Sequence, residues 1–375
     1  MADPLLSVRN LKTYFYTYAG VVKALEGVNL DICKGESIGL VGETGCGKSV
    51  TALSILRLID FPGKIVEGEV LFKGEDLLKK SEEEMREIRG RQIAIIFQDP
   101  MTYINPVYTI GEQMADVILR HQELREEVID MKVEDLEKNT RKVFGVNTGD
   151  LKSKVEELKR LKENPPKPSK RDAKRAALRK AVDLLKIVKM PDPERVVSQY
   201  PHELSGGMRQ RVMIAMALSC NPEVLIADEA TTFLDVTVQA QIFSLLSEIT
   251  AQTGTSTIII THDLGVVSEN CDKVAIMYAG NVVEYAGTVA LFDNPLHPYT
   301  VGLLNAIPKL HEDVEELDSI PGSIPDLIYP PSGCRFHPRC TYVKEVCRQE
   351  KPESIEAEPG HFVSCHLFDE LKGVS

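Results

Sequence analysis

The sequence predicts an α/β fold with a mostly parallel core sheet, and three observations support this prediction. Short β-branched and apolar runs alternate with longer segments of helical periodicity, which is the pattern of strand–helix–strand units. A glycine-rich loop follows the apolar run 37–41 and precedes a helical segment that begins near Lys48. The runs 93–97, 224–227 and 257–260 have the composition of further buried strands.

The two ends of the chain differ from this core. Segments 5–8 and 28–32 predict an antiparallel edge sheet. After Asp293 proline becomes frequent, and four of the eight cysteines lie between residues 334 and 365. We therefore expect a main domain over residues 1–293 and a small, loop-rich appendage over residues 294–375.

The composition restricts the class of protein. The 375 residues carry a formal net charge of −12, which argues against non-specific nucleic-acid binding. No apolar run approaches the ~20 residues needed to span a bilayer. The first ten residues lack the basic and apolar regions of a signal peptide. We expect the chain to stay in the cytoplasm and to act on a membrane only through partners.

Residues 120–170 interrupt the alternating pattern. Leu124, Val128 and Met131 repeat at helical spacing, and so do the apolar residues between 151 and 161. The segment 145–149 resembles a turn, and the proline-rich segment 164–168 ends any helix. We expect a charged helical hairpin, with a flexible charged insertion as the alternative.

The glycine-rich loop matches the phosphate-binding pattern G-x-x-x-x-G-K-[ST]. Its glycines let backbone N–H groups turn inward around a phosphate, next to the positive N-terminus of a helix. We expect Lys48 to reach the β- and γ-phosphates and the Ser49 hydroxyl to ligate Mg²⁺. The expected nucleotide-binding residues of this loop are Gly42, Glu43, Thr44, Gly45, Cys46, Gly47, Lys48, Ser49 and Val50.

Two adjacent carboxylates, Asp228 and Glu229, follow the apolar run 224–227. A buried strand would deliver both at its carboxyl end. Asp228 suits the Mg²⁺ shell, and Glu229 suits a general base that polarises an attacking water. Paired acidic residues after a strand are common, so the pair alone does not indicate a nucleotide site. The phosphate-binding loop earlier in the sequence is what makes this interpretation specific.

Residues 204–211, Leu-Ser-Gly-Gly-Met-Arg-Gln-Arg, resemble the signature sequence of ABC transporter ATPases. The resemblance implies an ABC-type ATPase domain with a helical subdomain over about 99–220, which binds ATP and Mg²⁺. In that family the signature of one subunit faces the γ-phosphate of the ATP held by the other. The expected signature residues are Ser205, Gly206, Gly207 and Met208.

Shorter motifs extend the resemblance over nearly the first three hundred residues. Gln98 is similar to the Q-loop glutamine, and His262 is similar to the switch histidine near the γ-phosphate. The pair Leu234 and Asp235 is similar to the D-loop. The resemblance therefore implies catalytic roles for Glu229, His262 and Gln98, and Mg²⁺ contacts for Ser49, Gln98 and Asp228.

An aromatic side chain near Phe15 or Tyr16 should stack on adenine, but the aromatic cluster 14–18 leaves the choice open. All of the expected nucleotide residues precede Asp263. We therefore expect changes in the cysteine cluster of the tail to leave ATP binding largely intact.

A closer resemblance is to the ATPases of oligopeptide and dipeptide importers. It is carried by residues 105–113, 231–241 and 294–300, and by Gly-Cys-Arg-Phe-His-Pro-Arg-Cys at 333–340. It implies a second, related ATPase subunit, two transmembrane permease subunits and, indirectly, an extracytoplasmic solute-binding protein. Ala230 and Phe233 depart from the family pattern, where proline and a small residue are usual, and the insertion is longer than usual.

The cysteine cluster consists of Cys334, Cys340, Cys347 and Cys365, in a compartment that keeps thiols reduced. Structural zinc usually includes a C-x2-4-C pair, which is absent here, and four thiolates also suit an iron–sulfur cluster. The resemblance implies a 4Fe–4S cluster, with zinc or unligated thiols as alternatives. A metal centre would cross-link a proline-rich appendage that buries little apolar surface.

The function implied by the resemblance is ATP hydrolysis at the cytoplasmic face of the cell membrane. It would energise import of a di- or oligopeptide, with an oligosaccharide or nickel as other solutes. A soluble ABC ATPase that acts on nucleic acid or ribosomes is the alternative from another class. Such proteins carry long coiled coils or two ATPase units, so we expect no nucleic-acid partner here. A redox-sensing tail is a third hypothesis.

Overall fold

The computed structural model describes residues 3–142, 156, 160, 165–231, 235–306 and 320–371, leaving aside the side chains of 137 and 139–142. The chain forms two compact units. The core unit contains Met1–Arg89, Ile93–Gln98 and Glu223–Ser375, and the helical unit contains Gly90–Gln92 and Asp99–Pro222. The C-terminal part of the chain belongs to the core unit, so the division into two units does not test the expected boundary at residue 293, which stays a prediction.

The main sheet of the core unit has eight described strands in the order β11-β12-β10-β9-β3-β8-β7-β6. From β9 to β6 neighbouring strands are parallel, and β10, β12 and β11 continue the sheet antiparallel. The predicted parallel core sheet is confirmed. The strands are β3 (Ser37–Val41), β6 (Ile93–Ile96), β7 (Val224–Asp228), β8 (Ser256–Thr261), β9 (Lys273–Tyr278), β10 (Asn281–Gly287), β11 (Ile355–Glu358) and β12 (His361–Val363).

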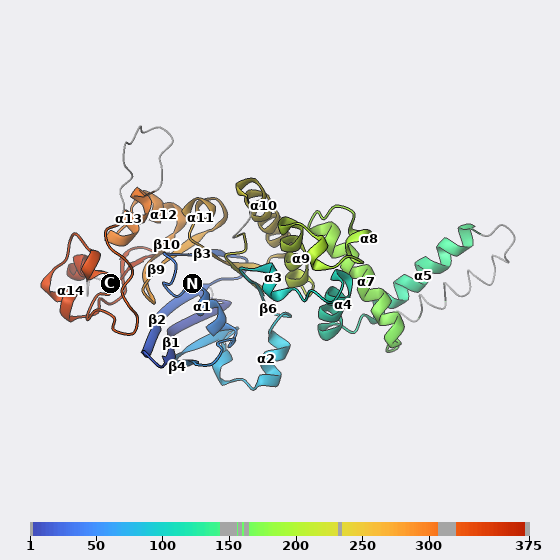
Figure 1. The fold of residues 1–375 in the computed structure, drawn as a ribbon, viewed down its shortest axis with the longest axis horizontal. Coiled ribbons are helices and arrows are strands. Elements are labelled where there is room, and N and C mark those ends of the chain that lie inside the picture. The colour runs from blue at the N-terminus through green and yellow to red at the C-terminus, as the bar shows by residue number, and fades with distance from the viewer. Residues whose placement is uncertain are drawn as a thin grey trace. The chain divides into compact units, whose positions relative to one another are not determined.

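A second, antiparallel sheet contains β2 (Gly20–Ile32), β1 (Leu6–Thr17), β4 (Gly63–Phe72) and β5 (Glu75–Asp76) in that order. Figure 1 shows β1, β2 and β4 together in blue. One apolar core joins the two sheets, because Leu25 and Val70 of the small sheet pack in the same cluster as Ile38 and Ile258 of the main sheet. Ile55 of the intervening helix α1 completes this core.

The helices of the core unit connect its strands. α1 is the next element after β3, and α10 and α11 flank β8 in the sequence. This order produces the parallel pairing, since a parallel neighbour requires a crossover connection. The helices are α1 (Lys48–Ile55), α2 (Glu82–Ile88), α10 (Val236–Thr253), α11 (Leu264–Asn270), α12 (Thr288–Asp293), α13 (Pro298–Asn305) and α14 (Glu345–Gln349), with 3-10 turns at Leu77–Lys79, His337–Arg339 and His366–Leu371.

The helical unit is built around α4, α7 and α9, which contact one another. α4 begins with a capping box, in which Thr109 and Glu112 each accept from the other's backbone N–H. The helices are α3 (Pro100–Tyr103), α4 (Ile110–His121), α5 (Arg125–Lys142), α7 (Lys170–Ile187), α8 (Pro193–Val196) and α9 (Gly206–Leu218), with a 3-10 turn at Pro201–Glu203.

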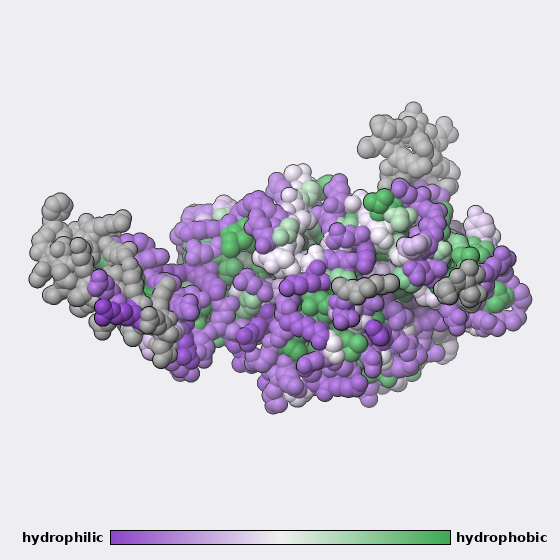
Figure 2. All heavy atoms as spheres, turned by 180° about the vertical axis from the view of Figure 1, so that it is seen from behind, coloured by the Kyte–Doolittle hydropathy of each residue, from purple (hydrophilic) through white to green (hydrophobic). Residues whose placement is uncertain are grey.

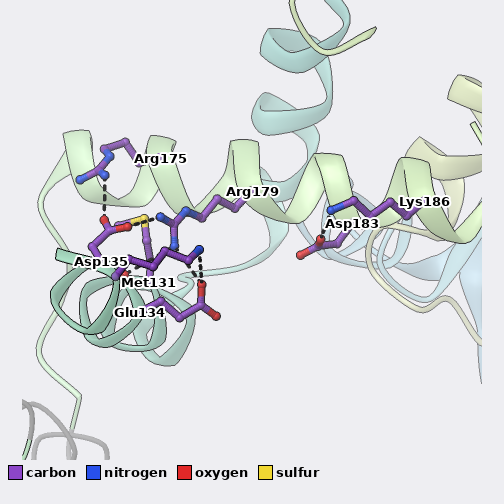
Figure 3. Close-up of polar contacts among 8 residues, drawn as sticks. Met131, Glu134, Asp135, Arg175, Arg179, Asp183 and Lys186 are labelled. Atoms are coloured by element: carbon purple, nitrogen blue, oxygen red, sulfur yellow. Dashed lines mark hydrogen bonds and ion pairs between the residues drawn. The ribbon is translucent and has the colours of Figure 1, made fainter. Parts of the chain in front are cut away.

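The first helix expected in the insertion is present as α5, and Leu124, Val128 and Met131 are buried as their spacing predicted. α5 packs against α7 through charged side chains (Figure 3). Arg175 lies 2.9 Å from Asp135, and Arg179 bonds the same carboxylate. The second expected helix, 151–161, lies almost entirely outside the described residues.

Glu284 of β10 ties the C-terminal hairpin to the rest of the core unit. Its carboxylate accepts the backbone N–H groups of Leu296 and His297, both at 2.8 Å, and lies 2.7 Å from Nε2 of His361 on β12. The Glu284 and His361 side chains are buried. A buried carboxylate is tolerated only when its oxygen atoms are paired, so this cluster fixes the tail on the sheet.

Hydrophilic side chains cover most of the face drawn in Figure 2, and hydrophobic ones gather there in small, separate groups. In the part of the chain that the structure describes, every helix is too short or too polar to cross a bilayer.

Glu284→Ala should destabilise the core unit. The change leaves the N–H groups of Leu296 and His297 and the ring of His361 without their buried partner. We therefore expect the free energy of unfolding to fall by about 3–5 kcal/mol. Urea unfolding followed by circular dichroism measures this loss. Glu83→Ala, on the exposed surface of α2, is the matched control and should change the value by less than about 0.5 kcal/mol. Equal losses in the two variants would contradict the role given to Glu284.

Candidate functional site

The predicted phosphate-binding loop connects β3 to α1 at the carboxyl end of β3. Lys48 spans the loop from inside, because its Nζ donates to the carbonyl oxygens of Gly42 at 2.7 Å and Glu43 at 3.2 Å. The Lys48 side chain is 5% exposed. Its ammonium group is therefore held at the centre of the loop, where a phosphate would replace the carbonyl contacts.

Two glycines of the loop allow no side chain. A Cβ on Gly42 would lie 2.2 Å from the carbonyl oxygen of Met277, and a Cβ on Gly47, whose φ is +107, would lie 2.8 Å from the Leu25 side chain. Gly47 is also the N-cap residue, immediately before the first residue of α1. Both positions therefore require glycine. Close packing thus explains why glycine occupies these two positions of the phosphate-binding pattern. Cys46 is fully buried and packs within the loop, and this burial raises the pKa of its thiol.

Glu229 is the meeting point of the predicted catalytic residues. Nε2 of Gln98 donates to its Oε2 at 2.6 Å. Its Oε1 lies 3.9 Å from Nζ of Lys48 and 3.8 Å from Nδ1 of His262. Three sequence motifs from distant parts of the chain thus converge on one carboxylate, which follows β7 directly.

The backbone holds Glu229 in an uncommon conformation. Its φ is +42, and its N–H donates to the carbonyl oxygen of Ile260 on β8 at 2.9 Å. A positive φ in a residue other than glycine costs free energy and persists where the surroundings impose it. The conformation turns the chain sharply after β7, between the two acidic residues.

Asp228 faces the first turn of α1. Its Oδ1 accepts a hydrogen bond from the Ser49 hydroxyl at 3.0 Å. Burial raises the pKa of Asp228 to about 6, against the lowering effect of the Ser49 hydrogen bond. A bound cation would lower the pKa of Asp228, because its positive charge stabilises the carboxylate. Asp228 and Ser49 thus supply adjacent oxygen atoms of the type that Mg²⁺ prefers.

His262 directly follows β8 and precedes an ordered turn. The side chain is 66% exposed, and the next residue, Asp263, caps α11 by accepting the N–H of Gly265 at 2.8 Å. Most of the ring is therefore accessible to solvent.

Of the two adenine candidates, Tyr16 is 48% exposed, with Nζ of Lys64 5.9 Å from its ring centroid, whereas Phe15 is half-buried.

The expected signature lies in the helical unit. Ser205 caps α9 and accepts the N–H of Met208 at 3.4 Å. Ser205 and Gly206 are exposed, and Gly207 and Met208 are half-buried. The N-terminal amides of α9 are therefore accessible to an anion.

The expected D-loop is described in part. Asp235 lies in the core unit, where it caps α10 by accepting the N–H of Val238 at 2.9 Å. Leu234 lies outside the described residues.

The four tail cysteines lie within electrostatic reach of one another. Burial raises the pKa of Cys334 to about 11 and that of Cys365 to about 12, and the neighbouring thiols add to each shift. Cys340 interacts with Cys347 in the same way. No three His, Cys, Asp or Glu side chains within the described ranges are arranged to hold a single metal ion.

One of the four sulfur atoms accepts a main-chain hydrogen bond that the geometry defines clearly. The N–H of Lys344 donates to Sγ of Cys347 at 3.4 Å.

Two residues beyond Asp263 contact the phosphate-binding loop, and the motif analysis did not assign them. The N–H of Glu43 donates to the hydroxyl oxygen of Tyr299 at 3.0 Å, and the carboxylate of Glu43 pairs with Arg339 at 3.0 Å. Both belong to segments that carried the family resemblance, 294–300 and 333–340, but nothing in the sequence pattern linked them to the loop. The C-terminal part of the chain therefore contacts the phosphate-binding loop, and the expectation that changes in the tail cysteines leave ATP binding intact stays a prediction.

Comparison with known proteins agrees with this geometry. Residues 25–232 match the family described as ABC transporter, and residues 283–347 match the C-terminal region of oligopeptide/dipeptide transporters. A dimeric ATP-binding cassette solved in a post-hydrolysis state with ADP and phosphate matches with a TM-score of 0.56. That match has 23% identity and covers 76% of this chain and 98% of the other, so it supports the fold.

The similarity to curated relatives extends over nearly the whole length of this chain. A probable peptide ABC transporter ATP-binding protein of Sinorhizobium fredii is 45% identical over 99% of this chain and 97% of its own. A dipeptide transport ATP-binding protein of Bacillus subtilis is 42% identical, over 98% and 96% respectively. The chain thus belongs to the ABC transporter family of ATP-binding proteins and carries the C-terminal region of the oligopeptide/dipeptide transporters.

Proposed function

We propose that this chain hydrolyses ATP to energise the import of a di- or oligopeptide through partner permease subunits. The observation that carries the proposal is the convergence of Gln98, Lys48 and His262 on the Glu229 carboxylate, beside a phosphate-binding loop. The family membership supplies the reaction, since ABC transporter ATPases hydrolyse ATP to drive transport. The names of the relatives, which specify peptides and dipeptides, support the solute class.

Each side chain of the site has a role that follows from its position. Glu229 accepts a proton from the attacking water, and Gln98 and His262 orient that water and the γ-phosphate. Lys48 neutralises phosphate charge within the loop. Ser49, Asp228 and Gln98 would hold Mg²⁺, which when bound offsets charge on the phosphate oxygens.

The coupling to transport requires a difference in affinity between conformations. ATP shifts an equilibrium only if it binds one state more tightly than the other. We infer that the exposed signature amides bind the γ-phosphate of ATP held by a second ATPase subunit, which makes the closed dimer the tight-binding state. The closed dimer would act on permease subunits from the cytoplasmic face of the membrane, with an extracytoplasmic binding protein delivering the peptide.

Glu229→Gln should separate ATP binding from ATP hydrolysis. Loss of a positioned general base costs ~10²–10⁴-fold in turnover, while the phosphate contacts of the loop remain. The test is peptide-stimulated ATPase activity in liposomes that contain the chain, its permease subunits and the binding protein. Glu223→Gln, at the other end of β7, is the control and should keep normal turnover.

Stimulation of the wild-type complex by peptides, and not by oligosaccharides or nickel, would support the proposed solute. If the Glu229→Gln variant hydrolysed ATP at a near-normal rate, the general base would have to be another residue. If nucleic acid or ribosomes stimulated the chain without permeases, the alternative function would replace the proposed one.

We propose further that the second ATPase subunit is a related but different chain. Val236, next to the expected D-loop, is 82% exposed, which suits a residue that another subunit covers. The family resemblance and the departures from the family pattern at Ala230 and Phe233 also favour a distinct partner. Light scattering of purified Glu229→Gln protein with ATP should show monomers alone and dimers after the related subunit is added. Full transport by homodimers with the permeases would contradict this proposal.

We also propose that the four tail cysteines bind one 4Fe–4S cluster. The four thiols lie within electrostatic reach of one another, and the sulfur of Cys347 accepts the backbone N–H of Lys344 at 3.4 Å. A cluster needs wider spacing than a single ion because each thiolate binds a different iron atom. The bound cluster would supply cross-links that hold the tail together.

Cys365→Ser should lower the iron content and loosen the tail. We choose Cys365 rather than Cys340 because Cys340 is adjacent to Arg339, which contacts the phosphate-binding loop. A change at Cys340 could therefore affect the loop as well as the metal site. Anaerobically purified wild-type protein should contain about four iron and four sulfide ions per chain. The variant should lose most of both and become sensitive to protease beyond about residue 320. Cys33→Ser, in the turn after β2, is the control. Stoichiometric zinc without sulfide would favour the zinc alternative.

A further inference from the structure

The phosphate-binding loop contains an acidic side chain, Glu43, at its second position. A carboxylate so close to the site of a polyphosphate would repel it, because like charges at short range disfavour each other's charged forms. In the structure Nη1 of Arg339 donates to both carboxylate oxygens of Glu43, at 3.1 and 3.0 Å. The charge of Glu43 is therefore balanced from the C-terminal part of the chain.

Arg339 is fixed in place by contacts on its other sides. Its Nε donates to the carbonyl oxygen of Pro321 at 2.8 Å, and its Nη2 donates to that of Ile320 at 3.3 Å. The guanidinium carbon lies 5.7 Å from the ring centroid of Tyr278, a favourable cation–π position. With a side chain only 6% exposed, Arg339 is pre-positioned against Glu43 and does not need to be ordered by nucleotide.

Tyr299 holds the backbone of the same residue. Its hydroxyl oxygen accepts the N–H of Glu43 at 3.0 Å, and its ring is fully buried. The ring packs edge-on against Tyr278, with centroids 4.7 Å apart, and against Phe336 at 5.4 Å. The backbone of Glu43 is therefore held by a side chain that is itself fixed by its packing.

We infer that Arg339 and Tyr299 are positioning residues for nucleotide binding, and that Arg339 acts by neutralising Glu43. The inference rests on the proposed ATP site and adds two residues from outside its motifs. It makes a specific prediction about charge. Without Arg339, the Glu43 carboxylate penalises ATP more than ADP, because ATP carries the additional γ-phosphate charge.

A double-mutant cycle tests this inference. Arg339→Ala should raise the Kd of a non-hydrolysable ATP analogue about tenfold, in line with the loss of a charge-assisted hydrogen bond. The Kd of ADP should rise by a smaller factor. In the Glu43→Gln background, Arg339→Ala should change the Kd of the analogue by less than about twofold. A residue that only supported folding would weaken binding equally in both backgrounds.

Calorimetry gives the Kd values, and melting temperatures show whether each variant folds. Arg339→Lys, which keeps the charge but not the two-oxygen contact, should give an intermediate Kd and serves if the alanine variant does not fold. Arg348→Ala, an exposed arginine in the same tail, is the matched control. Tyr299→Phe should raise the Kd about threefold, since one neutral hydrogen bond is lost.

Two outcomes would overturn the inference: unchanged affinity in Arg339→Ala, or an equal loss of affinity with and without Glu43. Either result would leave the proposed ATP site standing. A wild-type chain that failed to bind the analogue would instead refute the proposed function itself, so the two failures are distinguishable.

Discussion

The parallel register of four adjacent strands is the constraint on which the site depends. β3 pairs with β9 on one side and β8 on the other, and β8 pairs with β7. Val41 lies opposite Thr261, and Asp228 lies opposite Ile260. Because these strands run the same way, the loops that follow them emerge at one edge. A shift of one residue in either pairing would turn alternate side chains to the opposite face and separate Lys48 from Glu229.

Short-range patterns in the sequence predicted the parts of the fold that are set locally. The strand β3, its loop and the start of α1 follow from one apolar run, two obligatory glycines and a helix-forming segment. The identities of Asp228 and Glu229 followed in the same way, since their position after a buried strand fixes where they point. The mutual contact of Gln98, Lys48 and His262 with Glu229 needed the sheet order, which the family resemblance supplied and periodicity alone did not.

Long-range contacts explain what the sequence did not predict. Arg339 and Glu43 are 296 residues apart, and Tyr299 and Glu43 are 256 apart. No pattern of hydrophobic residues or turn signals encodes such pairings. The same holds for α5, whose helical spacing predicted its presence but not that Asp135 would pair with Arg175 and Arg179 of α7 (Figure 3). The partner of a charged residue can therefore be identified from the folded structure but not from the sequence pattern.

The C-terminal hairpin also has a consequence for how the protein is made. β12 covers the outer edge of β10 through Glu284 and Tyr285, and β11 extends the sheet beyond it. An uncovered strand edge pairs readily with other chains. During synthesis β10 emerges well before β12, and at about 5–20 residues per second the edge stays open for several seconds. The nascent chain therefore carries an open strand edge from the emergence of β10 until β12 is available, and a ribosome-bound chaperone would protect it during that interval.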